Sequence, residues 1–125
     1  MDRVGPLRDH DVVGRLAPDG QLAGRPVGLE AAHVRWFNFD GPDELDNGLA
    51  LCSLHHKLFD RGVLGIDAGH TIKVSRLYSA RSTAGGQVYD LHGTTLQARR
   101  GTQMPSPRHL NWHDTQVFKG EPLAA

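Results

Sequence analysis

Two short apolar runs surround a polar loop between Val27 and Gly62, and a helical pattern closes this segment. Val27–Val34 carries β-compatible residues without a break after Pro26, and Gly48–Leu51 is a second apolar run. Runs of this length bounded by turn residues are typical of strands. The polar loop between them is rich in Gly, Pro, Asp and Glu. The pattern therefore predicts two strands joined by an irregular connection.

A short helix is predicted directly after the second strand. Ser53 is a suitable N-cap for a helix that begins near Leu54, and Gly62 is placed to end it as the C′ residue. Helical spacing then turns an apolar stripe toward the strands and leaves His56 and Asp60 on a flank. The stripe consists of Leu51, Leu54, Leu58 and Phe59.

The groups that metal-assisted hydrolysis needs lie within this unit. His33 ends the first apolar run, and its imidazole, neutral near pH 7, can take a proton from water as a general base. Asn47 follows the polar loop, and its uncharged amide is expected to bond the His33 segment and fix the orientation of the imidazole. His56 and Asp60 are four residues apart, so on a helix they share one face, where a divalent cation could lie between them. This set is suited to metal-assisted hydrolysis.

The order His33, Asn47, His56, with Asp60 one turn further, resembles the HNH endonucleases. More narrowly, the chain is similar to the C-terminal nuclease domain of modification-dependent restriction enzymes that recognise phosphorothioated DNA. The resemblance covers roughly residues 21–120. It implies that His33 is the general base, that Asn47 holds it in place and that His56 ligates the metal. The matching segments read GLEAAHVRW, NGLALCSLHHKLFDRG and HLNWHDTQVFKG.

The expected fold class is α+β, with a ββα-metal core of the His-Me finger type, additional short antiparallel strands and an extended C-terminal arm. The expected organisation is a flexible N-terminal segment over residues 1–20 and a nuclease domain over residues 21–125, of which 21–68 form the core and 69–125 wrap it. Further strands are predicted at residues 63–67 and 71–75, as a hairpin, and at 88–91. Residues 97–107, with two arginines and two prolines, are expected to be extended.

The expected cofactor is a divalent cation held by His56 and Asp60. Many HNH enzymes carry a second ligand immediately before the general base, and this chain has Ala32 there. Two protein ligands can suffice for Mg²⁺ or Mn²⁺, which keep much of their hydration shell, and the affinity should then be weak. Zn²⁺, Ni²⁺ and Co²⁺ are the alternatives. Three cations of the chain are predicted to contact nucleic-acid phosphates: Arg35, Lys57 and Arg61.

Composition narrows the setting of this activity. The 125 residues suit one domain. The single cysteine, Cys52, excludes an internal disulfide and fits a reducing cytoplasm, and no apolar run approaches the roughly 20 residues of a membrane span. Net charge is zero, but residues 1–60 hold ten acidic against six basic residues, whereas residues 61–125 hold four against eight. An acidic part for the cation beside a basic part for phosphates suits a nuclease.

The expected substrate is double-stranded DNA, phosphorothioated or otherwise modified. A separate recognition domain or protein is expected to read it, and a homodimer is a further expectation. Two other functions remain open: a catalytically degenerate nucleic-acid-binding module, and a domain that binds metal only to fold. A binding module has no need of His33 as a base, and a structural zinc site normally has four nitrogen or sulfur ligands. A hydrolase using Cys52 is disfavoured because the thiol lies in an apolar run.

Overall fold

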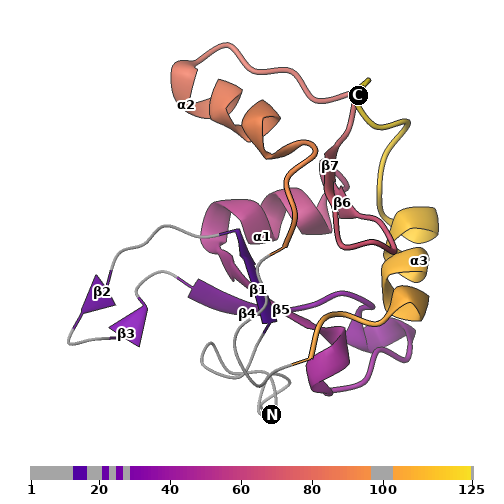
Figure 1. The fold of residues 1–125 in the computed structure, drawn as a ribbon. Helices are drawn as coiled ribbons and strands as arrows, with labels where there is room; N and C mark the ends of the chain where they lie inside the picture. The colour runs from indigo at the N-terminus through magenta and orange to yellow at the C-terminus, as the bar shows by residue number, and fades with distance from the viewer. Residues whose placement is uncertain (1–12, 17–20, 23–24, 27–28, 97–102, 125) are drawn as a thin grey trace.

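The computed structural model describes residues 13–16, 21–22, 25–26, 29–96 and 103–124. Its first part is a three-stranded sheet in the order β1-β5-β4 (Figure 1). Strand β4 runs antiparallel to β5, with His33 opposite Gly48, while β1 runs parallel to β5. The predicted pair of strands is therefore present, and β5 is the central one. The strands are β1 (Val13–Leu16), β4 (Leu29–His33) and β5 (Gly48–Cys52).

Two smaller antiparallel sheets complete the strands. Strands β2 (Gln21–Leu22) and β3 (Arg25–Pro26) form one, and β6 (Leu64–Ile66) and β7 (Ile72–Val74) form the other. The second is the hairpin predicted from the sequence, and the backbone of His70 in its turn has a φ of 66°. Helices and short, mostly antiparallel strands together give the mixed architecture expected of an α+β domain.

Helix α1 (Ser53–Asp60) follows β5 without a linker and packs against β4, β5 and β6. Its N-cap is Cys52, whose sulfur accepts a hydrogen bond from the backbone N–H of His55 at 3.4 Å, so the predicted cap at Ser53 is wrong by one residue. Gly62 ends the helix as predicted, with a φ of +83°. A Cβ at Gly62 would lie 2.2 Å from the carbonyl oxygen of Val117, so both the backbone conformation and the close approach require glycine.

The hydrophobic core explains why β5 is apolar without alternation. Leu49, Ala50 and Leu51 are all at most 1% exposed, because β5 has a neighbour on each edge and is covered on both faces. Phe59 of α1 is completely buried in the same core. Leu54, which was expected to face the strands, is 54% exposed, so that prediction is wrong. The helix buries a narrower stripe than the apolar pattern suggests.

The C-terminal part is more helical than predicted. Residues 88–91, predicted as a strand, lie in the 3-10 helix η3 (Gln87–Leu91), directly after the short helix α2 (Thr83–Gly86). Helix α3 (Pro107–Gln116) lies in the part of the wrapping extension for which no helix is predicted from the sequence. Ser106 followed by Pro107 at the first helical position is a helix-start signal, so this helix does have a local signature.

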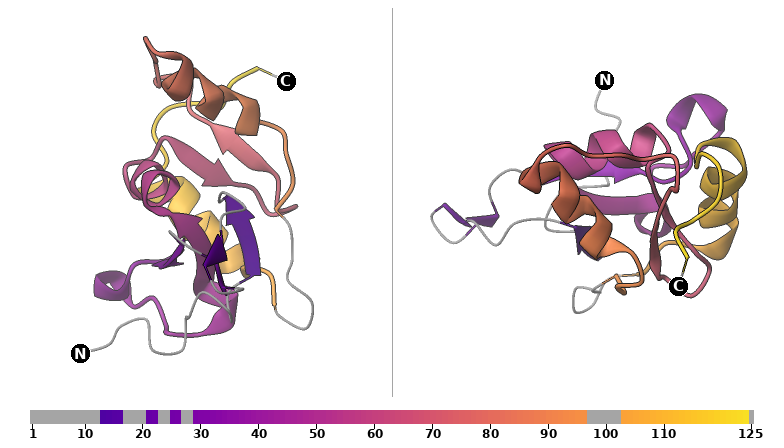
Figure 2. Two further views of the ribbon diagram at one scale, coloured as in Figure 1. Left: turned by 90° about the vertical axis from the view of Figure 1, so that its left-hand side faces the viewer. Right: turned by 90° about the horizontal axis from the view of Figure 1, so that it is seen from above.

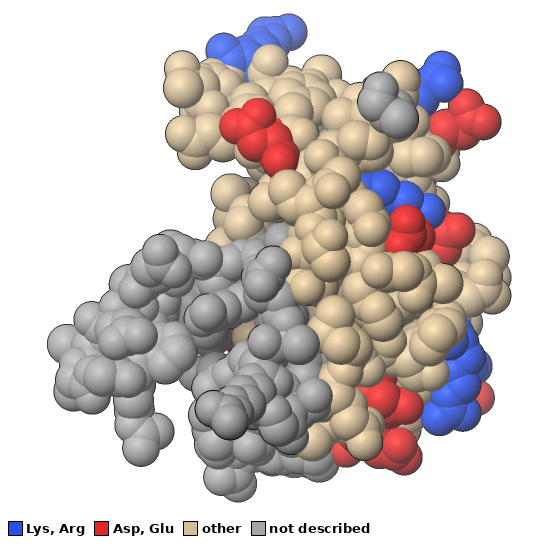
Figure 3. Space-filling model, viewed as in Figure 1, with Lys and Arg blue, Asp and Glu red and all other residues tan. Residues whose placement is uncertain are grey.

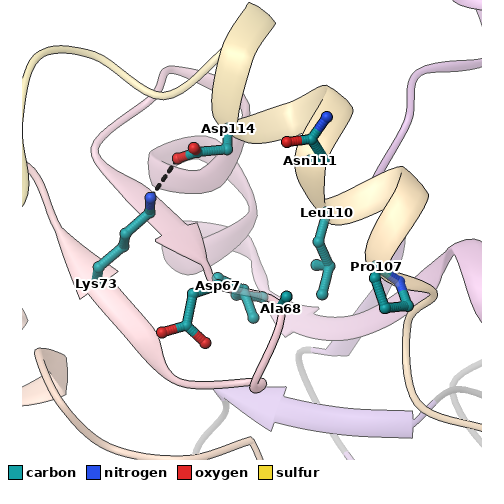
Figure 4. A pocket seen from close by; sticks show the side chains of 8 residues that line it. Asp67, Ala68, Lys73, Pro107, Leu110, Asn111 and Asp114 are labelled. Atoms are coloured by element: carbon teal, nitrogen blue, oxygen red, sulfur yellow. Dashed lines mark hydrogen bonds and ion pairs between the residues drawn. The ribbon is translucent and has the colours of Figure 1, made fainter.

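Helix α3 packs against strand β6, and the two views of Figure 2 place it beside the central sheet. Lys73 of β7 forms an ion pair with Asp114 of α3, across a small pocket between the hairpin and the helix (Figure 4). At the other end of the helix, the backbone N–H of Ser106 donates to the carbonyl of Asp46 at 2.8 Å. These contacts fix α3 both to the hairpin and to the loop that precedes β5.

His113 of α3 joins that helix to α1. Its ring stacks on Phe59 with centroids 3.7 Å apart and an interplanar angle of 7°, and its Nε2–H donates to the carbonyl of Phe59 at 2.8 Å. Burial lowers the pKa of His113 to about 4. The imidazole is therefore neutral and acts as a core side chain.

Several sequence expectations concern the ends of the described ranges. Residues 13–16, within the segment expected to be flexible, form β1, while residues 1–12 lie outside the described part. Residues 97–102 of the expected arm also lie outside it. The loop between β4 and β5 contains two 3-10 helices, η1 (Phe37–Phe39) and η2 (Leu45–Asn47). Within the described ranges, no helix has the length and apolar character that a membrane crossing requires.

Candidate active site

A cleft of about 250 Å³ lies between strand β4, the chain that follows it and helix α1. Ala31 and His33 point to the same side of β4 because side chains alternate along a strand, while Ala32 is turned into the core and is 1% exposed. The helix contributes two residues one turn apart. The cleft is lined by Ala31, His33, Trp36, Phe37, His56 and Asp60. Three of the residues singled out from the sequence thus share one cavity.

The imidazole of His56 lies between two carboxylates. Its Nε2 is 3.2 Å from Oδ2 of Asp60, and its Nδ1 is 2.8 Å from Oε1 of Glu30. The hydrogen bond to Asp60, aided by Glu30 and opposed by partial burial, raises the pKa of His56 to about 8. The ring is therefore mostly protonated at neutral pH in the metal-free protein. A cation that binds Nε2 has to displace this proton.

Glu30 is a member of the site that the sequence does not single out. Glu30 is exposed, yet it accepts hydrogen bonds from His56 and from the Ser53 hydroxyl, the latter at 3.0 Å. These two bonds lower the pKa of its carboxyl group, that from His56 most. Glu30 and His56 are 26 residues apart, so no local pattern could have paired them. Only the β4–α1 packing brings them together.

The imidazole of His33 is held by a second carboxylate. Its Nε2 lies 2.5 Å from Oδ1 of Asp43, which belongs to the loop between η1 and η2. The side chains are 11% and 22% exposed, respectively. The edge of the His33 ring meets Phe37, with centroids 6.5 Å apart. In the sequence Asp43 is only one of several acidic loop residues, and no local pattern indicates that it contacts His33.

Asn47 is completely buried and braces the backbone around the site rather than the imidazole itself. Its Oδ1 accepts from the N–H of Arg35 at 2.7 Å, and its Nδ2 donates to the carbonyls of Arg35 and Pro42 at 2.9 and 3.0 Å. Its own carbonyl accepts from the N–H of Val34 at 3.0 Å. The expected link to the His33 segment is thus present in the backbone, and no bond from Asn47 to the His33 ring is found among the described residues.

The three predicted phosphate contacts differ in their surroundings. Lys57 and Arg61 are exposed on and just after α1. Arg35 is half-buried: its Nε donates to the carbonyl of Phe39 at 2.6 Å, and its guanidinium lies 5.9 Å from the ring centroid of Trp112. Figure 3 shows one face of the molecule, on which Lys and Arg side chains form separate groups with acidic side chains near several of them. On the described part of that face, the basic groups do not join into a continuous stripe.

Aromatic side chains form one wall beside the cleft. The ring centroids of Trp36, Phe39 and Trp112 lie 5.6 to 6.0 Å from one another. Trp112 therefore packs against Trp36 and Phe39, and it joins α3 to η1. Phe37 and Phe39 are 45% and 52% exposed, and Phe37 lines the cleft together with Trp36. Trp36 and Trp112 pack on each other, while Trp36 and Phe37 contribute to the cleft surface.

The donor set fits a weakly held, hard cation. Among the described residues, no group of three or more His, Cys, Asp or Glu side chains could hold a metal ion. His56 and Asp60 both line the cleft, and Nε2 of His56 and Oδ2 of Asp60 are 3.2 Å apart, close enough for one ion to contact both. The bond from Glu30 to the other ring nitrogen is the arrangement by which carboxylates orient metal-binding histidines. One imidazole and one carboxylate leave the remaining positions to water and substrate oxygens.

Comparisons with known proteins agree with the resemblance noted in the sequence. Residues 13–67 match the sequence model of the HNH endonuclease family, so the chain is similar to HNH endonucleases over β1 to β6 and the entire cleft. The family match supports a nuclease, and more specifically an endonuclease that acts on DNA.

One solved structure that resembles the chain is described as "Modification dependent TagI restriction endonuclease". It is 24% identical with a TM-score of 0.48, over 71% of this chain and 27% of that chain. The chain thus spans about a quarter of the length of that enzyme. No match is found among curated proteins.

Proposed function

We propose that the protein is a metal-dependent HNH endonuclease that hydrolyses phosphodiester bonds of double-stranded DNA. The observation that carries this proposal is the cleft that contains His33, His56 and Asp60 together. An imidazole on one wall and an imidazole–carboxylate pair on the other provide a base and a cation site within one cavity. The similarity of residues 13–67 to HNH endonucleases supports the same chemistry.

His33 is the proposed general base. In its neutral form it removes a proton from the water that attacks phosphorus, which makes that water a better nucleophile. The partly shielded position of the ring, with its side chain 11% exposed, limits competition from bulk water. His33 is also next to the Asn47-braced backbone, because Val34 and Arg35 are the residues that Asn47 holds. The backbone next to the proposed base is therefore held in place by hydrogen bonds to a buried residue.

His56 and Asp60 are the proposed holders of a divalent cation, Mg²⁺ or Mn²⁺ first. When bound, the cation would supply Lewis-acid stabilisation of charge on the phosphate and on the leaving oxygen. Glu30 orients His56 by accepting from Nδ1, which leaves Nε2 directed at Asp60. Lys57 and Arg61 are proposed to bind neighbouring phosphates, since both are exposed close to Asp60 in the chain.

Cleavage of supercoiled plasmid tests the proposal. With Mg²⁺ or Mn²⁺ the protein should nick or linearise the plasmid, and EDTA should stop it. His33→Ala and His56→Ala should each lose activity, whereas His55→Ala, a change at the adjacent helix position outside the cleft, should retain it. If His33→Ala cleaves like the wild type in a preparation free of other nucleases, the enzyme assignment fails. DNA binding without cleavage by the wild type would favour the degenerate binding module instead.

Dependence on DNA modification is proposed on the sequence resemblance alone. A separate domain or protein would read the modification, and this chain would supply the cleavage. Three duplexes of one sequence are compared: one with phosphorothioate linkages, one with methylated bases and one unmodified. This chain by itself should then cut all three at similar rates. A strong preference for one modification by the isolated chain would contradict this division of labour.

A further inference from the structure

We propose that Asp43 is a positioning residue for His33, which holds the imidazole in the tautomer whose Nδ1 can take a proton from water. The inference rests on the proposed function, because it assumes that His33 is the base. It adds a residue that no motif in the sequence singles out. It also assigns the two ring nitrogens of His33 different tasks.

The contact itself is short and partly shielded. Oδ1 of Asp43 lies 2.5 Å from Nε2 of His33, and the two side chains are 22% and 11% exposed. Hydrogen bonds between a carboxylate and an imidazole are charge-assisted and stronger than bonds between neutral groups. Partial removal from water strengthens them further. The bond is therefore able to fix both the position and the rotation of the ring.

The proton assignment follows from the chemistry of the two groups. An ionised carboxylate only accepts hydrogen bonds, so Nε2 of His33 has to carry the proton of this bond. A neutral imidazole carries one ring proton, and Nδ1 then keeps its lone pair. Asp43 occupies Nε2, which leaves Nδ1 as the ring nitrogen that can accept a proton, on a residue that lines the cleft. Without the carboxylate, both tautomers would be populated.

The loop that carries Asp43 is fixed by Asn47 and by a close backbone approach. Nδ2 of Asn47 donates to the carbonyl of Pro42, immediately before Asp43, at 3.0 Å. The N–H of Gly41 donates to the carbonyl of Trp36 at 2.9 Å, and a Cβ at Gly41 would lie 1.8 Å from the carbonyl oxygen of Arg35. The loop thus folds directly back on the chain that follows His33. Asn47 acts on the base through this loop and its Asp43.

Single-turnover and steady-state cleavage of a DNA duplex by Asp43→Asn tests the proposal. An amide can turn its NH₂ toward Nε2 and favour the wrong tautomer, a change that costs about 10⁴-fold in kcat in serine proteases. We expect a fall of about 10²- to 10⁴-fold in kcat with little change in KM, since substrate contacts remain. Asp43→Glu, which restores a carboxylate, should recover part of the activity. Glu44→Gln is the matched control, because Glu44 is the exposed neighbouring carboxylate, and its activity should stay unchanged.

The ring tautomer gives a readout that does not depend on activity. Long-range ¹H–¹⁵N correlation spectra at a pH where His33 is neutral should show the Nε2–H form in the wild type, with the signal assigned by its disappearance in His33→Ala. Asp43→Asn should show the Nδ1–H form or a mixture. This measurement on the wild type remains decisive if Asp43→Asn does not fold.

The outcomes separate this inference from the proposed function. Loss of cleavage in His33→Ala together with wild-type kcat in folded Asp43→Asn would overturn the role of Asp43 and leave the nuclease assignment intact. An Nδ1–H tautomer in the wild type would also overturn it. Wild-type cleavage by His33→Ala would instead remove the proposed function itself.

Discussion

The side-chain amide of Asn47 makes two hydrogen bonds to the backbone of Arg35. Its oxygen accepts from the N–H of Arg35 at 2.7 Å, and its NH₂ group donates to the carbonyl of Arg35 at 2.9 Å. The same NH₂ group also reaches the carbonyl of Pro42 at 3.0 Å. Asn47 is completely buried. An amide is therefore required here, because no other side chain of this size both accepts and donates in this way.

Asn47→Asp should destabilise the fold as well as slow cleavage. The carboxylate would place an acceptor opposite two carbonyl oxygens in a buried position, and the expected cost is about 2–4 kcal/mol in the free energy of unfolding. Urea unfolding near pH 7 measures it. Asn38→Asp, at an exposed position in η1, is the control and should change stability little. Equal stability of the two variants would show that the amide is not needed.

Gly41→Ala should displace the loop that carries Asp43. The added methyl group would meet three backbone atoms of Arg35 and Trp36 at 1.8 to 2.7 Å, so the loop has to move. We expect a lower melting temperature and a lower kcat. Gly86→Ala is the matched control, since nothing lies within 4 Å of the corresponding position and the residue is helical. That variant should be unchanged or stabilised by up to about 1 kcal/mol.

Glu30→Gln should weaken cation binding without altering the cleft surface. Removal of the carboxylate that orients His56 is expected to lower Mn²⁺ affinity about 10- to 100-fold. Titration calorimetry at a pH above the His56 pKa of about 8 keeps proton competition small. Glu44→Gln serves as the control. An affinity unchanged from the wild type would mean that Glu30 only contacts His56 in the absence of metal.

DNA binding should fall steeply with salt, because phosphate contacts dominate sequence-independent binding. Removing Lys57 and Arg61 together should weaken binding and reduce the slope of log K against log[salt] by about 1 for each phosphate that the two side chains no longer neutralise. Arg76→Ala is a suitable control, since Arg76 is 61% exposed and pairs with Glu121 rather than with the site. Fluorescence anisotropy at several salt concentrations measures the slopes. An identical slope for the double variant would exclude both residues from the DNA interface.

Stability should decline in mild acid because of His113. Its pKa is about 4 in the folded protein and 6.5 in the reference state, so above pH 6.5 both the folded and the unfolded protein hold it neutral. Below pH 6.5 only the unfolded chain takes up the proton, and stability decreases until about pH 4, by up to about 3 kcal/mol.

Urea unfolding from neutral pH into this acidic range tests the dependence. In His113→Phe, which keeps a ring against Phe59, the decline should be shallower than in the wild type by the His113 contribution. A variant that follows the wild-type curve across this range would assign the decline to other groups.

The β4–β5–α1 unit could be predicted because its signals are local. Apolar runs, the loop composition and Gly62 at the helix end lie within a few residues of the structures they specify. The cap at Cys52 differs from the prediction because a sulfur acceptor is rarer at this position than the hydroxyl that Ser53 offers. Leu54 differs because the apolar pattern does not show how much of the helix the strands cover.

The carboxylates that hold the two imidazoles could not be predicted, for a physical reason. Glu30 and Asp43 meet His56 and His33 only after the strands pair and the loop folds back. Their local sequence is that of ordinary exposed acids. Helix α3 differs from them, because Pro107 after Ser106 is a local signal for its start, although the side chain of Ser106 makes no capping hydrogen bond.

The direct passage from β5 into α1 has a consequence for how such a protein could diversify. Asn47 ends η2, β5 begins at the next residue, and α1 begins as soon as β5 ends. Asn47 and the proposed cation holders are thus carried by consecutive elements without an intervening loop, and α1 packs back against β5 and β4. Insertions elsewhere can reshape the surface that meets a substrate without altering the spacing of the reacting groups. Strand β5 thus sets the distance between Asn47 and helix α1, whereas the length of the loops can vary.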